Sequence, residues 1–77
     1  MSAVLWRVTI DGIRMELWQS RSVHSHLPNY TAAFWLVNEP KHMTISHLGQ
    51  DLEDALSLFG NTVRHHRRLT GLSLIHI

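Results

Sequence analysis

The chain has 77 residues, with seven Lys and Arg, six Asp and Glu, and a formal net charge of +1. This length allows one domain, close to the lower size limit for a self-sufficient hydrophobic core. A hydrophobic fraction of 44% argues against disorder, and the absence of cysteine excludes disulfides and thiolate metal sites. No apolar run approaches the roughly 20 residues of a membrane span and no signal peptide is visible, so we expect a soluble, cytoplasmic protein that does not enter a membrane.

Residues 4–18, VLWRVTIDGIRMELW, predict a β-hairpin. Two alternating runs flank Asp11-Gly12, which is typical of a two-residue type I′ turn because both central residues need positive φ. On one side of the ribbon the turn pairs Ile10 with Ile13, Val8 with Met15 and Trp6 with Leu17, and on the other Thr9 with Arg14, Arg7 with Glu16 and Leu5 with Trp18. We expect the opposite charges of Arg7 and Glu16 to stabilise this register.

Two further strands are expected after a polar loop. Residues 30–37, YTAAFWLV, are rich in strand formers and apolar on both faces, which predicts a central strand or one covered by a partner. Residues 42–46 favour a fourth strand over an early helix capped by Thr44. With a four-residue turn at 38–41, Leu36 would face Met43 and Phe34 would face Ile45.

Residues 49–69 predict the only helix. Its apolar stripe consists of Leu48, Leu52, Ala55, Leu56, Phe59 and Val63. Acidic residues in the first turns and the basic run 64–68 in the last turn would both complement the helix dipole. Gly60 could instead end a first helix, with Asn61 capping a second, and Gly71 is a typical residue just beyond a helix end.

These elements indicate an α+β domain: an antiparallel sheet of three or four strands, the N-terminal hairpin first, with one C-terminal helix packed on one face. The strand followed by Asp51–Leu56, DLEDAL, resembles the small sheet-plus-helix antitoxin modules of the HicB type. That resemblance implies the same two-layer fold and assigns no role to any residue.

Residues 72–77, LSLIHI, form an apolar string with no polar face. They could form a short extra strand or a docked tail. All six residues also resemble the translation of CTGTCTCTTATACACATC, a transposon-end sequence used as an adapter in sequencing libraries. This resemblance implies that a reading frame ran from a natural fragment into an adapter. We therefore expect one domain at 1–71 and a non-native tail at 72–77, and the natural chain could continue as a larger protein.

Seven histidines make a metal site worth considering. His24 and His26 point the same way in an extended chain, so a third ligand would have to come from His42, His47, His65 or His66. No spacing here matches a zinc motif, a nucleophile elbow or a phosphate-binding loop, and so short a chain leaves little room for a substrate pocket. We expect a non-enzymatic protein with no catalytic residue, cofactor, metal site or small-molecule substrate.

An exposed apolar surface is the first candidate for a functional site. If the helix covers the Trp6 side of the sheet, the other side presents Leu5, Trp18, Trp35 and Val37. Exposed tryptophans in one patch are typical of a protein interface, either with another protein or with a second copy. The sequence therefore favours a small interaction or regulatory module, such as an accessory protein of a phage or other mobile element.

The basic stretch RHHRR is the second candidate. Arg64, Arg67 and Arg68 share one face of a helix and could bind nucleic-acid phosphates. We favour the interpretation of their charge as a complement to the helix dipole, because the chain is less basic than a dedicated nucleic-acid-binding domain.

Overall fold

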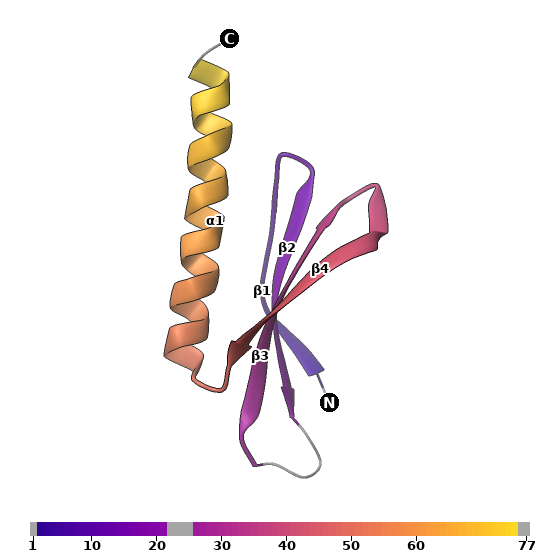
Figure 1. The fold of residues 1–77 in the computed structure, drawn as a ribbon, viewed down its shortest axis with the longest axis vertical. Coiled ribbons are helices and arrows are strands. Elements are labelled where there is room, and N and C mark those ends of the chain that lie inside the picture. Colours follow the sequence, from indigo (N-terminus) through magenta and orange to yellow (C-terminus); the bar gives the residue numbers. More distant parts are fainter. Residues whose placement is uncertain (1, 22–25, 76–77) are drawn as a thin grey trace.

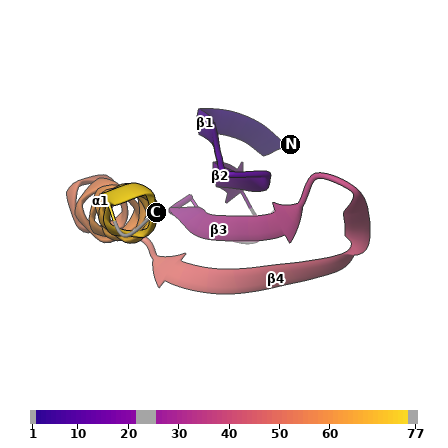
Figure 2. The same cartoon turned by 90° about the horizontal axis from the view of Figure 1, so that it is seen from above.

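The computed structural model describes residues 2–21 and 26–75, and the side chains of 3–21 and 26–67. Its elements are β1 (Ser2–Ile10), β2 (Ile13–Arg21), β3 (Pro28–Leu36), β4 (Glu39–Gly49) and α1 (Leu52–Ile75). The strands form one antiparallel sheet in the order β1-β2-β3-β4, and α1 lies against one of its faces (Figure 1). Seen from above, the other face carries no element of the described chain (Figure 2). The predicted α+β fold is confirmed, with four strands.

The N-terminal hairpin has the predicted turn. Asp11 and Gly12 both adopt positive φ, of 52° and 78°. Five of the six predicted pairs are present, but the pairing of Leu5 with Trp18 is wrong. A bulge between Val4 and Trp6 leaves Val4 opposite Trp18 and Leu5 unpaired. Three consecutive apolar residues at 4–6 make the alternation ambiguous, so the sequence pattern could not place this bulge.

The fourth strand is confirmed, and Thr44 lies inside it rather than capping a helix. Its predicted register is wrong, because a two-residue turn at 37–38 replaces the expected four-residue turn and Leu36 pairs with Glu39. An irregularity in the pairing between Phe34 and Leu36 then shifts the register again, so that Phe34 faces Thr44 and Ile45 faces Ala33. A slip of one residue moves a side chain to the opposite face of a sheet, so Ile45 lies away from α1.

The helix begins at Leu52, three residues later than predicted, because Asp51 caps it: the backbone N–H of Asp54 donates to Asp51 Oδ2 at 3.0 Å. It continues through Gly60, where the indole of Trp6 would lie 3.7 Å from an added Cβ. It also continues past Gly71, since one glycine costs a helix only about 1 kcal/mol. The backbone of 72–75 is therefore helical rather than a strand, and residues 76–77 lie outside the described part of the chain.

The core lies between α1 and the sheet. It consists of Met15, Leu17, Tyr30, Ala32, Ala55, Phe59 and Val63. The ring of Phe59 packs edge-on against Trp6, with centroids 5.2 Å apart, and stacks with Phe34 at 6.4 Å. The predicted stripe is too wide, because Leu52 and Leu56 remain 43% and 38% exposed. Residues spaced by four from Ala55 point at the sheet, so these two leucines lie on the flank of the helix.

Alanine substitutions at two glycines should change stability in opposite directions. Gly12→Ala should destabilise the protein by about 1–2 kcal/mol, because its φ of 78° is left-handed. Gly60→Ala should stabilise it by about 0.5–1 kcal/mol, since the new Cβ meets Trp6 at an ordinary contact distance of 3.7 Å. Urea unfolding measures both changes. A stabilising Gly12→Ala would contradict the type I′ turn, and a destabilising Gly60→Ala would contradict the packing of Trp6 on α1.

Candidate functional site

The face of the sheet turned away from α1, called the open face below, is built from three cross-strand rows. Residues directly opposite each other in an antiparallel sheet share a face. The rows are Val4–Trp18–Thr31–His47, Arg7–Glu16–Ala33–Ile45 and Thr9–Arg14–Trp35. The two tryptophans thus lie on the two central strands, one on each side of the row that contains Glu16.

Three of the four predicted partner-binding residues lie together on or beside the open face. Trp18 and Trp35 are partly buried there, and Val37 is 51% exposed at the end of β3. Trp35 and Val37 line a shallow hollow of about 380 Å³ with Thr9, Arg14 and Glu16. The fourth, Leu5, is 43% exposed in the bulge of β1 and is not opposite Trp18 as predicted.

Two apolar residues of the open face were missed by the sequence reasoning. Val4 is 41% exposed and lines a second hollow, of about 260 Å³, with Ala3, Glu16 and Trp18. Ile45 is 52% exposed. No pattern in the sequence signals the bulge that places Val4. Turn length alone could not have placed Ile45, because a two-residue turn followed by regular pairing would set it opposite Tyr30 on the covered face. Only the irregular pairing between Phe34 and Leu36 brings Ile45 opposite Ala33.

A charged cluster lies at the centre of the open face. Glu16 is only 8% exposed and is held by three side chains. The indole of Trp18 donates to Oε1 at 2.8 Å, Nε of Arg14 donates to Oε2 at 3.1 Å, and Nε of Arg7 lies 3.3 Å from Oε2. Arg14 also donates to Thr9 Oγ1 at 3.0 Å. The sequence predicted only the Arg7–Glu16 pair, although residues two apart on a strand share a face and signal the others.

The charged cluster orients Trp18 and carries a net positive charge. Because its N–H bonds to a residue two positions back along the same strand, the indole of Trp18 lies along the sheet surface. Two guanidinium groups and one carboxylate sum to +1, and the side chain of Arg7 is 56% exposed. An arginine carries five N–H donors, so donors remain available beyond those bound to Glu16.

The pKa of Glu16 reflects this environment. Burial raises the pKa, but the hydrogen bonds from Trp18 and Arg14 and the positive charges of Arg7 and Arg14 outweigh burial and hold the pKa below its usual value of 4.5. Glu16 therefore stays ionised near neutral pH and serves as the acceptor that orders its three neighbours.

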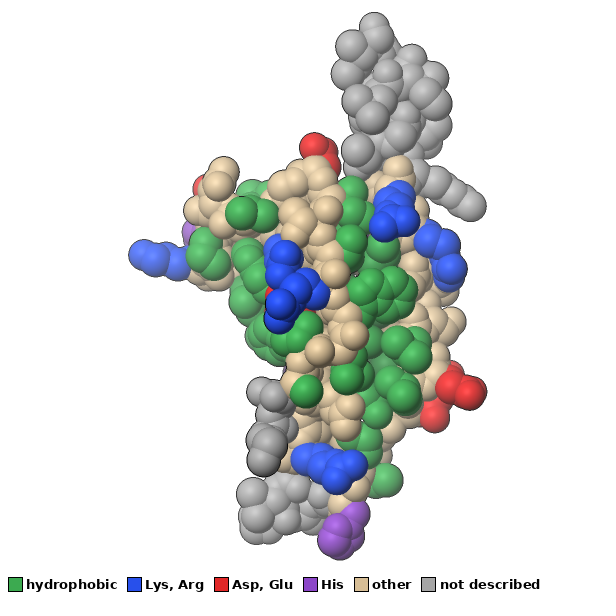
Figure 3. Space-filling model, turned by 180° about the vertical axis from the view of Figure 1, so that it is seen from behind, with side chains coloured by type: hydrophobic (Ala, Val, Ile, Leu, Met, Phe, Trp, Pro, Cys, Tyr) green, Lys and Arg blue, Asp and Glu red, His purple; other side chains and the backbone are tan. Residues whose placement is uncertain are grey.

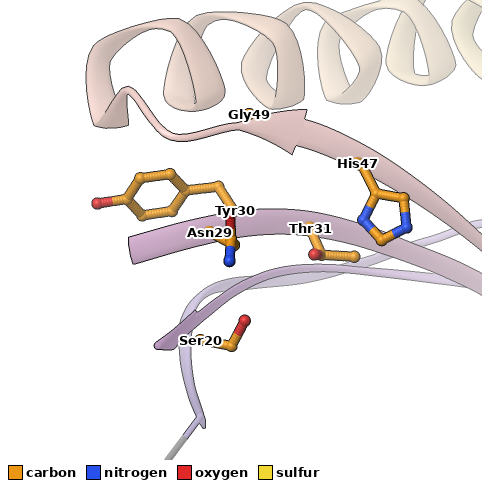
Figure 4. Close-up of a pocket in the computed structure, with 6 residues that line it drawn as sticks. All are labelled: Ser20, Asn29, Tyr30, Thr31, His47 and Gly49. Atoms are coloured by element: carbon orange, nitrogen blue, oxygen red, sulfur yellow. The ribbon is translucent and has the colours of Figure 1, made fainter. Parts of the chain in front are cut away.

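A pocket of about 390 Å³ adjoins the open face at the ends of β2 and β3 (Figure 4). Its lining residues are Ser20, Asn29, Tyr30, Thr31, His47 and Gly49. The ring of Tyr30 points away from His47 (Figure 4), and Tyr30 belongs to the buried core. Among the described residues, no hydrogen bond joins His47 to Thr31 or Ser20.

The residues of the nucleic-acid alternative lie on α1. Arg64 and Arg67 are exposed, and Arg64 donates to Asn61 Oδ1 at 2.5 Å. The side chain of Arg68 lies outside the described residues. The helix continues well beyond these arginines, so explaining their charge as a last-turn complement to the dipole is wrong. Figure 3 shows Lys and Arg side chains in separate groups on one side of the molecule, with hydrophobic side chains between them.

His24 of the considered metal site lies outside the described part of the chain, and no group of three potential ligands occurs within that part. No described helix combines the length and apolarity needed to cross a bilayer. Comparisons of the chain with protein-family models, curated proteins and solved structures find no match.

Neutralising the central carboxylate should destabilise the fold in a pH-dependent way. At pH 7, Glu16→Gln should cost about 1–3 kcal/mol, because the donors of Trp18 and Arg14 lose a buried, charged acceptor. Since the pKa of Glu16 is lowered on folding, this contribution is complete above pH 4.5 and is lost as the pH falls below 4.5 through the folded-state pKa. Urea unfolding of both proteins at pH 7 and about pH 3 measures the change.

The matched control is Glu39→Gln, at an exposed carboxylate beside the β3–β4 turn, which should change stability by less than about 0.5 kcal/mol. A destabilisation by Glu16→Gln that stays the same at both pH values would contradict the role given to the Glu16 charge.

Proposed function

We propose that the protein is a non-enzymatic interaction module whose open face binds a protein partner through Trp18 and Trp35. The observation that carries this proposal is the position of both tryptophans on the central strands of a face that no described element covers. Tryptophan and arginine are the residue types most enriched at the energetic centres of protein interfaces. Exposed aliphatic side chains of Val4, Val37 and Ile45 extend the contact area around them.

The charge of the open face defines the chemistry of the partner. The Arg7–Glu16–Arg14 cluster has a net charge of +1 and retains unused N–H donors. A partner that inserts an Asp or Glu side chain among apolar groups would satisfy these donors with charge-assisted hydrogen bonds. A second copy of the chain, face to face, would instead bring two net positive clusters together, which electrostatics disfavours. We therefore favour a different protein with an acidic, apolar surface.

The module would act by binding to a surface of its partner, as a small accessory or regulatory protein does. A cytoplasmic location accords with a chain that lacks cysteine, because such a chain needs no oxidising compartment to fold. Nucleic-acid binding through Arg64, Arg67 and Arg68 is the alternative, and it predicts an affinity that falls steeply with salt.

Peptides selected from a random display library against the purified protein should carry an acidic residue next to aromatic or aliphatic residues. Trp35→Asn should weaken binding of a selected, fluorescein-labelled peptide by about tenfold or more, because this side chain lines the hollow beside Arg14. Leu58→Asn, at a 50% exposed residue of α1, is the matched control and should leave the affinity unchanged. Fluorescence anisotropy measures the affinity of the original protein and of both variants for the labelled peptide.

Equal affinities of the two variants for the peptide would contradict the proposal. A labelled oligonucleotide, titrated in parallel, tests the alternative. Salt-dependent binding of this oligonucleotide that is lost in Arg64→Ala/Arg67→Ala, with no peptide enriched, would replace the proposal by the alternative.

A further inference from the structure

β4 is an edge strand with an unpaired outer side. It hydrogen-bonds to β3 alone, and no described element lies beyond it (Figure 2). All of its residues except Met43 and Leu48 are exposed to solvent. Backbone N–H and C=O groups along such an edge are a template for another strand.

Natural edge strands are commonly blocked by proline, lysine, other charged residues or bulges. β4 has such features only at its ends: Pro40 and Lys41 near its start, and irregular pairing with β3 on both sides of a regular stretch from Thr44 to His47. Residues 43–47, MTISH, contain no proline, lysine, arginine, aspartate or glutamate. The opposite edge, β1, is blocked by its bulge at Leu5 and by the charge of Arg7.

The sequence of this unblocked stretch is complementary to itself. We propose that β4 pairs antiparallel with β4 of a second copy of the chain, around a two-fold axis at Ile45. The register places Ile45 opposite Ile45 of the second copy, Thr44 opposite Ser46, and Met43 opposite His47. Apolar pairs and Thr–Ser pairs stabilise antiparallel sheets, and no like charges face each other.

The pairing would join the two sheets into one of eight strands, because each copy supplies four. An axis perpendicular to the sheet keeps both helices on one side and makes the two open faces continuous on the other. Such an isologous interface is the commonest kind in homodimers. It would also enlarge a core that is small for an independent domain. The pairing uses the β4 backbone and not Trp18 or Trp35, so it does not depend on the proposed partner.

Two charge variants test both the dimer and its register. Thr44 and Ser46 are exposed residues of β4 that lie opposite each other across the proposed axis. Thr44→Lys/Ser46→Lys should place like charges opposite each other and weaken dimerisation by at least about tenfold. Thr44→Lys/Ser46→Glu should place each lysine opposite a glutamate and keep dimerisation within about threefold of the original chain.

Sedimentation equilibrium over a range of concentrations measures the mass of the full chain. The original protein should pass from the mass of one chain to that of two as its concentration rises. Ala3→Lys, on the exposed β1 edge, is the control and should not alter this behaviour. A mass of one chain at every concentration would overturn the proposal, and so would equal dimerisation of the two double variants. Trp35→Asn should leave the mass unchanged, so failure of the partner proposal can be distinguished from failure of this one.

Discussion

The structure depends on the two-residue turn at Asp11-Gly12. Its length sets the register of β1 and β2, and that register assigns every side chain of the hairpin to one face. Val8 and Met15 are thereby placed under α1, whereas Arg7 and Glu16 are placed on the opposite face. The turn is also linked to the second hairpin, because the backbone N–H of Val37 donates to the carbonyl of Gly12 at 2.9 Å.

The two faces of the sheet are stabilised by different interactions. On the covered face, Phe59 contacts the rings of Trp6 and Phe34, and burial of apolar surface is the main stabilising force. On the open face, Glu16 is buried without a helix above it, and its charge is balanced by arginines and an indole N–H. A buried carboxylate with this many donors holds Trp18 in one position. A rigid aromatic side chain loses little conformational freedom on binding, which favours an interface.

The proposed function and the proposed dimer use separate surfaces of one small domain. Partner binding would use the side chains of β2 and β3 on the open face, and self-association would use the outer backbone of β4. If both occur, the dimer presents two copies of the open face side by side, and a partner with two matching sites would bind with increased avidity. A chain of only 77 residues would in this way combine a stable assembly with an extended binding surface.

The amino-acid sequence by itself determined the N-terminal hairpin and the helix of this protein. Asp11-Gly12 and the alternation around it predict the hairpin register, and the acidic start and apolar spacing of 52–63 predict the helix. Only the tertiary structure decided the bulge at Leu5, the short turn at 37–38 and the positions of Val4 and Ile45 on the open face. The physical reason is that register and bulges depend on pairing between strands, and several pairings satisfy the same apolar pattern until the helix and its neighbours select one.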